Sequence, residues 1–480
     1  MYPSVTIRFK HTALCQEGCR RIALLPSLTI ENVATVAENR LALLRQKMEA
    51  REARIGIIGM GYVGLPLALL FSGERFRVTG FDIAADKVEM LNAGRSYIVR
   101  IPPEAIEEAR KAGFCATCEY SEIAQMDAVI ICVPTPLDDH HEPDLSFVVG
   151  TVKSIAPHIH ADQLIVLEST TYPGTTEELV VPLLEAGNKN GIRVTREPDD
   201  RGVHVVFSPE REDPGNDSVS RQDIPKVVGG CSAAAVELAA AMYGAIFKRV
   251  IEVSSPRVAE MTKLLENIYR CVNIALVNEL KQLCMRMGID IHEVIEAAKT
   301  KPFGFQAFYP GPGLGGHCIP IDPYYLSWKA REFEFRTRFI ELAGEVNAHM
   351  PYFVVEQLAA GLNEHSKPLK GSRVLLLGVA YKRDIDDLRE SPSLTIIELL
   401  RERGALVEYN DPYFRHVGRG RHYDLNMNST PLEKVGDFDA VLIVTDHSAY
   451  DYAAIVDQAK LVVDTRNATK GIDSPKIVRC

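Results

Sequence analysis

The sequence predicts an α/β protein with two doubly wound parallel-sheet domains joined by a long helix. In both halves of the chain, short runs of β-branched and aliphatic residues alternate with helix-forming segments, which is typical of parallel strands covered by helices. Between Pro256 and Gly288 there is neither proline nor glycine, which predicts the connecting helix. The length of 480 residues corresponds to about three domains.

Composition excludes several classes of protein. Hydrophobic residues make up 46% and charged residues 25% of the chain, as in globular rather than disordered proteins. No run approaches the roughly 20 apolar residues of a membrane span. The net charge of −10 argues against a nucleic-acid partner, although a local basic cluster could hold a small anion. The scattered cysteines predict reduced thiols in the cytoplasm. The pairs Cys15/Cys19 and Cys115/Cys118 have no second Cys or His pair at zinc-site spacing, so no metal is expected.

Residues 1–50 differ from the rest and are expected to form an N-terminal extension. The first 30 residues are basic, but they lack the uninterrupted apolar core and cleavage site of a secretory signal. The composition of residues 29–54 predicts an added helix. The alternative is that translation begins at Met48, just before the first strand.

A glycine-rich turn follows the first predicted strand, residues 54–58. The motif reads Gly59-Met60-Gly61-Tyr62-Val63-Gly64. Gly59 permits a tight turn, Gly61 lets a pyrophosphate approach the backbone, and Gly64 allows close packing of the next helix on the strand. After the next strand, Asp82 would bind the ribose hydroxyls and repel a 2′-phosphate, and Lys87 would help to hold the ribose. The predicted cofactor is therefore NAD.

Polar residues follow three later buried runs. Thr135, Thr170 and Glu210 each come shortly after such a run. Because ligands of an open parallel sheet bind beyond the carboxyl ends of its strands, these residues are candidates for one shared cleft. Each could instead be a loop cap, and for Thr170 a mainly structural role is the favoured interpretation.

The long helix carries a candidate pair. Lys263 and Asn267 are four residues apart, so they lie on one helix face. Spacing alone favours the alternative, a solvated lysine beside a helix-surface asparagine.

A second candidate lies in the loop that follows. Its four closely spaced glycines, which would let the backbone wrap around a ligand, are Gly311, Gly313, Gly315 and Gly316. Cys318 ends the loop near a helix start, where the pKa of a thiol falls and its nucleophilicity rises. We therefore expect a nucleophile rather than a buried inert cysteine, with Asp322 four residues on.

The second sheet domain opens with residues 372–378 but lacks the glycine motif, so we expect it to bind something other than NAD. Lys382, Arg389 and Arg466 stand at strand ends or in loops, where cations could meet phosphate. For each alone, a solvated surface charge is the default.

From about residue 52 to 472 the chain resembles the UDP-glucose/GDP-mannose dehydrogenases, a family of nucleotide-sugar 6-dehydrogenases. Six motifs occur in the family's order, namely residues 59–66, 133–136, 208–211, 263–267, 315–322 and 389–392. The resemblance implies two Rossmann-like domains, residues 51–235 and 351–480, around a central helical dimerisation region, residues 236–350. Residues 1–50 have no counterpart.

The resemblance also implies a four-electron oxidation of a primary alcohol to a carboxylate with two NAD+. The positions that match catalytic residues are Cys318, Lys263, Asn267, Glu210, Asp322 and Thr135. Cys318 would hold the half-oxidised sugar, first as a thiohemiacetal and then as a thioester. Lys263 and Asn267 would stabilise the negative oxygen, and Glu210, positioned by Thr135 and Asp322, would be the general base for hydrolysis.

The implied partners are a UDP-sugar and a second copy of the chain. Besides the glycine motif, Thr135, Thr170 and Arg389 match cofactor positions. The positions that match substrate contacts are Glu210, Arg211, Lys263, Asn267, Tyr309, Gly311, Gly313, Gly315, Gly316, Lys382 and Arg466.

Within the family, the segments around Glu168, Glu210 and Cys318 look most like enzymes that oxidise UDP-N-acetyl-D-glucosamine for surface polysaccharide such as O-antigen. UDP-glucose enzymes usually have a glutamate where this chain has Pro214. Oxidation of UDP-N-acetylgalactosamine, UDP-N-acetylmannosamine or UDP-glucose remains an alternative. So do a dehydrogenase that transfers one hydride per sugar and a catalytically silent nucleotide-sugar sensor.

Overall fold

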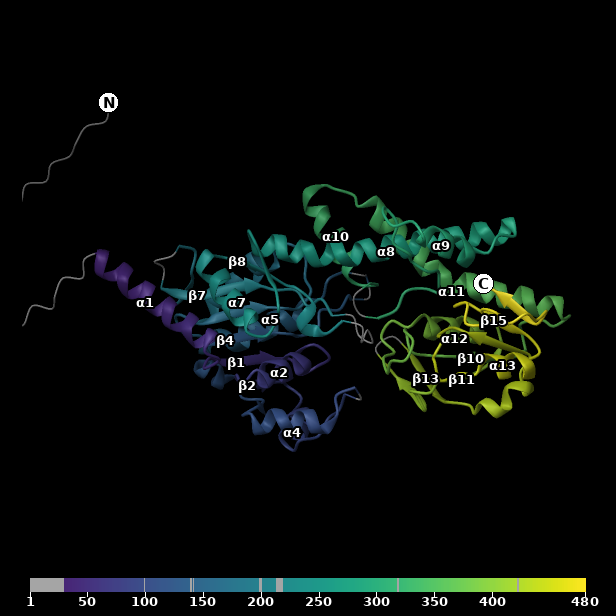
Figure 1. Cartoon of the computed structure of the whole chain (residues 1–480), viewed down its shortest axis with the longest axis horizontal. Coiled ribbons are helices and arrows are strands. Elements are labelled where there is room, and N and C mark those ends of the chain that lie inside the picture. The colour runs from purple at the N-terminus through teal and green to yellow at the C-terminus, as the bar shows by residue number, and fades with distance from the viewer. Residues whose placement is uncertain are drawn as a thin grey trace, which may run out of the picture.

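The computed structural model describes residues 30–98, 100–138, 140, 142–197, 201–212, 219–316, 319–420 and 423–480. Two sheet-containing domains lie side by side, and helices α8 (Pro256–Met287) and α11 (Arg338–Glu364) run along one side of the pair (Figure 1). The predicted fold class is confirmed.

The first domain is built on a sheet with the order β3-β2-β1-β4-β5-β7-β8-β9, and β6 pairs with β7. The pairings are parallel except that of β7 with β8, which is antiparallel. The strands are β1 (Arg54–Ile58), β2 (Arg77–Phe81), β3 (Cys115–Thr117), β4 (Ala128–Ile131), β5 (Leu164–Leu167), β6 (Arg193–Val194), β7 (Gly202–Phe207), β8 (Lys226–Gly230) and β9 (Val250–Val253). Because strand order reverses between β1 and β4, a ligand cleft is expected at their carboxyl ends.

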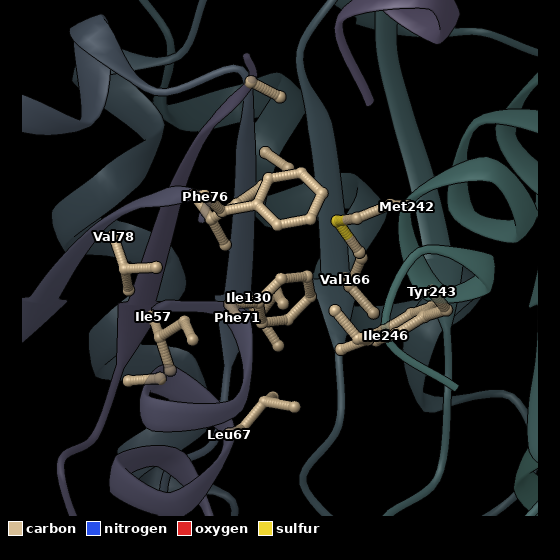
Figure 2. Close-up of a cluster of buried hydrophobic side chains, with 14 of the residues drawn as sticks. Ile57, Leu67, Phe71, Phe76, Val78, Ile130, Val166, Met242, Tyr243 and Ile246 are labelled. Atoms are coloured by element: carbon tan, nitrogen blue, oxygen red, sulfur yellow. The ribbon is translucent and has the colours of Figure 1, made fainter. Parts of the chain in front are cut away.

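Helices cover both faces of this sheet. They are α1 (Ile30–Glu49), α2 (Gly64–Gly73), α3 (Ala85–Asn92), α4 (Pro103–Lys111), α5 (Ser146–Ile155), α6 (Val181–Gly187) and α7 (Ala233–Gly244). On one face, aromatic residues of α2 and α7 fill the core between helices and strands (Figure 2). The rings of Phe71 and Phe76 meet edge to face at 5.3 Å. Such a buried aromatic pair holds the end of α2 firmly against the sheet.

The predicted helix within residues 29–54 is confirmed as α1. Leu44 and Met48 are buried in the same core as α2 and α7. At its surface Arg45 pairs with Glu237 of α7, and Lys47 lies 2.8 Å from Asp127. Translation from Met48 would therefore remove a helix that contributes to the core of the first domain.

The central helices connect the two domains. Helix α8 begins after Ser255, whose hydroxyl accepts from the amide of Val258, and ends at Gly288 with a φ of 71°. Its 32 residues correspond to a length of about 48 Å. Its companions are α9 (Ile291–Lys299), α10 (Asp322–Ala330) and α11, and α10 and α11 pack against it. Helix α8 therefore packs on the first sheet and also on α11, which covers the second sheet.

The second domain has a parallel sheet of order β11-β10-β14-β15-β16 and a separate antiparallel hairpin, β12-β13. The elements are β10 (Arg373–Leu377), α12 (Pro392–Glu402), β11 (Leu406–Asn410), β12 (His416–Arg419), β13 (Asp424–Asn428), β14 (Ala440–Ile443), α13 (Tyr452–Gln458), β15 (Val462–Asp464) and β16 (Ile477–Arg479). Helix α11 packs on this sheet through Val354 and Leu358. Among the described residues, no helix combines the length and apolar character needed to cross a bilayer.

Candidate functional site

The glycine motif forms a turn in which two glycines are sterically required. Gly59 has a φ of +93°, and a Cβ atom there would lie 2.6 Å from the carbonyl oxygen of Cys132. A Cβ on Gly64 would lie 2.0 Å from the carbonyl oxygen of Gly59. A Cβ on Gly61 would meet nothing within 4 Å, so this backbone faces open space at the start of α2. The turn fits a pyrophosphate, which binds free N–H groups at a helix N-terminus.

Asp82 stands beside this turn at the end of β2. Its carboxylate accepts hydrogen bonds from the amides of Met60 and Ala84, both at 2.9 Å, and Lys87 Nζ lies 4.0 Å away. The hydroxyl of Tyr97 donates to the carbonyl of Met60. The acid is therefore fixed next to the glycines, where a ribose of NAD would lie.

The second domain repeats this turn but uses its acid differently. Gly378 has a φ of +83°, and Asp411, which follows β11, accepts from the amides of Val379 and Ala380 at 2.7 and 3.1 Å. Here, however, Nε2 of the buried His447 lies 3.1 Å from the same carboxylate. Asp411 is engaged internally, in agreement with the prediction that this half does not bind NAD.

Four predicted catalytic residues converge from three segments. Lys263 and Asn267 are buried on one face of α8, which excludes the solvated alternative. Lys263 Nζ donates to the carbonyl of Glu210, and Asn267 Nδ2 donates to the carboxylate of Asp322. A cation, an amide and a carboxyl group thus share one buried position at the interface of α8, α10 and the first sheet.

Asp322 is the first residue of α10 and is only 1% exposed. Burial raises the pKa of its carboxyl group from 3.8 to about 6, although Lys263 and the hydrogen bond from Asn267 act in the opposite direction. This group therefore titrates near pH 6, in contact with Asn267 on the buried face of α8.

The loop after β7 carries Glu210, whose Oε1 atom accepts from the amides of Arg211 and Glu212 at 2.8 and 2.7 Å. Arg211, predicted to contact substrate, pairs with Glu266 at 2.6 Å and donates to the carbonyl of Pro225. In this structure its guanidinium thus holds the loop against α8, and a substrate contact stays a prediction.

The other two predicted first-domain residues lie at the carboxyl ends of neighbouring strands. Thr135 follows β4 and is 2% exposed, and the adjacent carbonyl of Pro136 accepts from the Tyr325 hydroxyl of α10 at 3.2 Å. Thr170 follows β5 and is partly buried. Because β4 and β5 pair in parallel, both threonines lie on the edge of the sheet that carries the glycine turn.

Arg389 of the second domain reaches the glycine motif of the first. Its guanidinium lies 5.0 Å from the centre of the Tyr62 ring and 2.7 Å from Asp387. Its carbonyl accepts from the amide of Gly316, at 2.9 Å. One residue therefore joins the second domain, the predicted cofactor turn and the glycine-rich loop.

The glycine-rich loop lies against the second domain. A Cβ on Gly311 would lie 2.7 Å from an Arg466 guanidinium nitrogen, and those on Gly315 and Gly316 would collide with Tyr381, the residue before Lys382. Gly313 has a φ of +135°, which favours glycine. Burial lowers the pKa of Arg466, whose Nε donates to the carbonyl of Val444. Arg466 thus lies at the beginning of the glycine-rich loop, and Tyr381, which precedes Lys382 in sequence, lies at its end.

Two predicted residues need separate mention. Tyr309 is 43% exposed, and its hydroxyl donates to Glu296 at 2.6 Å. Cys318, the predicted nucleophile, lies outside the described residues.

Sequence reasoning missed Asn278, whose Oδ1 atom accepts from the amide of Gly311 at 2.9 Å. It stands eleven residues after Asn267, or three helical turns, on the same buried face of α8. This helical spacing from Asn267 could have predicted from the sequence that Asn278 lies on the same face. The site thus extends along α8 to the base of the glycine-rich loop.

Comparison with known proteins assigns the chain to one family. Residues 53–247 match the NAD binding domain, residues 257–349 the central domain and residues 375–471 the UDP binding domain of the UDP-glucose/GDP-mannose dehydrogenase family. The UDP-N-acetyl-D-glucosamine 6-dehydrogenase of Pseudomonas aeruginosa is 34% identical over 401 residues, which cover 83% of this chain and 92% of that protein.

The UDP-N-acetyl-D-mannosamine dehydrogenase of Pyrococcus horikoshii is 34% identical over 429 residues, covering 87% of this chain and 96% of that protein. A solved structure of the UDP-D-ManNAc dehydrogenase from Pyrococcus horikoshii has a TM-score of 0.78 at 31% identity and covers 88% of this chain and 97% of that one. A UDP-glucose dehydrogenase from Pyrobaculum islandicum has a TM-score of 0.75 at 27% identity, covering 88% and 96%.

Proposed function

Because the chain belongs to the UDP-glucose/GDP-mannose dehydrogenase family and is an NAD-dependent oxidoreductase of that family, we propose that its substrate is UDP-N-acetyl-D-glucosamine. The C6 alcohol is oxidised to a carboxylate, for the synthesis of a surface polysaccharide. The similarity to the Pseudomonas aeruginosa enzyme and the segments around Glu168 and Glu210 support this sugar.

One observation carries the proposed chemistry, namely the convergence of Glu210, Lys263, Asn267 and Asp322 beside the glycine-rich loop. A dehydrogenase that stopped at the aldehyde would need no carboxylate to activate water. A sensor would need no buried lysine and amide at one place. The convergence therefore favours a reaction that ends in hydrolysis.

The first oxidation removes a proton from the C6 hydroxyl group and a hydride, which carries two electrons, from the C6 carbon. The proton passes through water to Glu210, while the Lys263 ammonium donates into this relay and, with the Asn267 amide, stabilises the negative oxygen. NAD+, when bound against the glycine turn and Asp82, supplies the acceptor for the hydrogen and electrons that C6 gives up in both oxidations.

The second oxidation proceeds on the enzyme. Cys318 Sγ bonds to the aldehyde carbon as the carbonyl oxygen takes up a proton, and the resulting thiohemiacetal loses a proton from that oxygen and a hydride from C6 to become a thioester. Glu210 then takes a proton from a water molecule, whose oxygen bonds to C6 as the C6–Sγ bond breaks. The products are the uronic acid and the Cys318 thiolate, and Glu210 releases its proton to solvent before the next turnover.

The test is NADH released per sugar consumed, measured with UDP-N-acetylglucosamine, UDP-N-acetylgalactosamine, UDP-N-acetylmannosamine and UDP-glucose. We expect two NADH per sugar and the highest kcat/KM with UDP-N-acetylglucosamine. Two NADH with another sugar favoured would keep the chemistry and replace the substrate. A value of one would establish the single-hydride alternative, and binding without NADH the sensor.

A further inference from the structure

A buried ion pair lies behind the segment that carries Glu210. Lys226 is the first residue of β8 and Glu168 follows β5, and they are 3% and 1% exposed. Lys226 Nζ is 2.9 Å from Glu168 Oε1, and the hydroxyl of Tyr243 donates to that oxygen. The lysine also lies 5.0 Å from the centre of the Tyr243 ring, one of the core residues of α7 (Figure 2). Three elements thus hold one ammonium group in place.

Stability alone does not account for this pair. Taking two charges out of water costs free energy that their attraction often fails to recover, so apolar residues in such positions are frequently as stable or more stable. Glu168 Oε2 is buried and has no hydrogen-bond partner among the described residues, which adds to the cost. We therefore expect the buried Lys226 charge to have a functional role, through the contacts that its ammonium group makes.

The ammonium group holds the backbone next to Glu210. Lys226 Nζ donates to the carbonyl of Pro209 at 3.3 Å, while Lys263 of α8 donates to the carbonyl of Glu210. Lysines from two different elements therefore hold consecutive carbonyls of one segment. Beyond that point the chain turns, and the Glu210 carboxylate accepts from its own following amides.

The charge of Lys226 also acts on Glu210 directly. Burial alone would lower the pKa of the lysine, but the carboxylates of Glu168 and Glu210 together raise it, so the amine stays protonated at neutral pH.

We propose that Lys226, held by Glu168 and Tyr243, is a positioning residue that orients Glu210 for thioester hydrolysis. This inference rests on the proposed role of Glu210 as general base. Lys226 acts through the backbone and charge of the Glu210 segment, so its loss should slow hydrolysis selectively and leave sugar and cofactor binding in place.

The experiment compares wild type with Lys226→Met, Lys226→Arg and the double variant Glu168→Gln/Lys226→Met. In Lys226→Met we expect kcat to fall roughly ten- to a hundredfold, the range a small misplacement of a catalytic group produces. After rapid mixing with UDP-sugar and NAD+, two NADH per site should appear in a burst, and intact-protein mass should show the thioester accumulating. Lys226→Arg should recover part of kcat because it keeps a cationic donor.

The double variant separates positioning from stability. The amide that Glu168→Gln introduces can still accept from Tyr243, and no unpaired charge is left, so we expect Tm to recover while kcat stays low. Lys329→Met is the matched control, since Lys329 is 4% exposed and pairs with Glu178 at 2.7 Å at the far end of α10. It should lower Tm without accumulation of thioester.

Recovery of kcat in the double variant, or a slow Lys226→Met enzyme without thioester, would overturn the inference. The wild type is measured in the same assay. If it releases no NADH with any UDP-sugar, the proposed function fails, whereas a normal wild type beside an unimpaired Lys226→Met variant refutes only the role of Lys226.

Discussion

At the scale of single residues, Asp322 joins protein stability to catalysis. Burial gives its carboxyl group a pKa of about 6 instead of 3.8, so the folded protein favours the protonated form. The stabilising contribution of the protonated acid is complete below about pH 4 and is lost as pH rises through about 6. This rise in pKa corresponds to roughly 3 kcal/mol of folding stability that is lost when the acid is fully ionised.

Asp322→Asn removes that titration and keeps an acceptor for Asn267. We expect the variant to be more stable than wild type at pH 8, by up to roughly 3 kcal/mol, and to show little difference at pH 4. Its kcat should fall, because in the proposed mechanism Asp322 positions the groups around Glu210. Thermal unfolding across this pH range measures the first effect. A stability difference that does not depend on pH would contradict the burial argument.

At the scale of elements, α8 presents two opposite faces. Lys263, Asn267 and Asn278 lie on the buried face. The other face carries exposed apolar residues at spacings of three, four and, once, seven, namely Val258, Met261, Leu265, Tyr269, Leu276, Leu280, Leu283 and Met287. Such a continuous apolar stripe along a helix is typical of a helix–helix interface. We therefore expect two copies of the chain to pair through α8.

Leu276→Glu places a charge near the middle of this stripe. We expect the protein to shift from dimer to monomer in light scattering or sedimentation, because an unpaired carboxylate in an apolar interface is costly. The matched control is Leu406→Glu, which changes a similarly exposed leucine at the edge of the second sheet, 59% against 52% exposed. A dimer that survives only in the control supports the interface, and a monomeric wild type would refute it.

At the scale of the whole molecule, the two domains meet where Arg389 covers Tyr62 of the glycine motif. A cation on an aromatic face contributes about 0.5–2 kcal/mol, so the second domain should strengthen cofactor binding to the first.

Arg389→Leu is therefore expected to raise KM for NAD about three- to thirtyfold and to change KM for the UDP-sugar less. Arg419→Leu, at an exposed arginine of the β12-β13 hairpin, should leave both values unchanged and is the control. Steady-state kinetics with each ligand varied in turn measures the effect. Equal changes in both KM values would instead point to a general loosening of the two domains.

The sequence was a good guide wherever function depends on local spacing. Strand, turn and helix follow one another within the glycine motif, and Lys263 and Asn267 share a face because of the helical period. Both features could be predicted without knowledge of tertiary contacts.

Other features depend on pairings that no local pattern records. Lys226 reaches Pro209 because β8 pairs antiparallel with β7, the exception in an otherwise parallel sheet. Arg211 was expected at the substrate, yet in the structure it pairs with Glu266 across 55 residues of chain. Long-range partners of this kind become visible only when the fold is known.

The turn at Gly378 has a consequence for the origin of the chain. Its glycine, its strand order and its acid at the end of the next strand copy those of the amino-terminal half. Such agreement is expected if an ancestral mononucleotide-binding unit was duplicated. In the second half Nε2 of His447 contacts the acid, whereas the corresponding Asp82 of the first half stands beside the predicted cofactor turn, so one scaffold can serve two ligands of different shape within a single polypeptide.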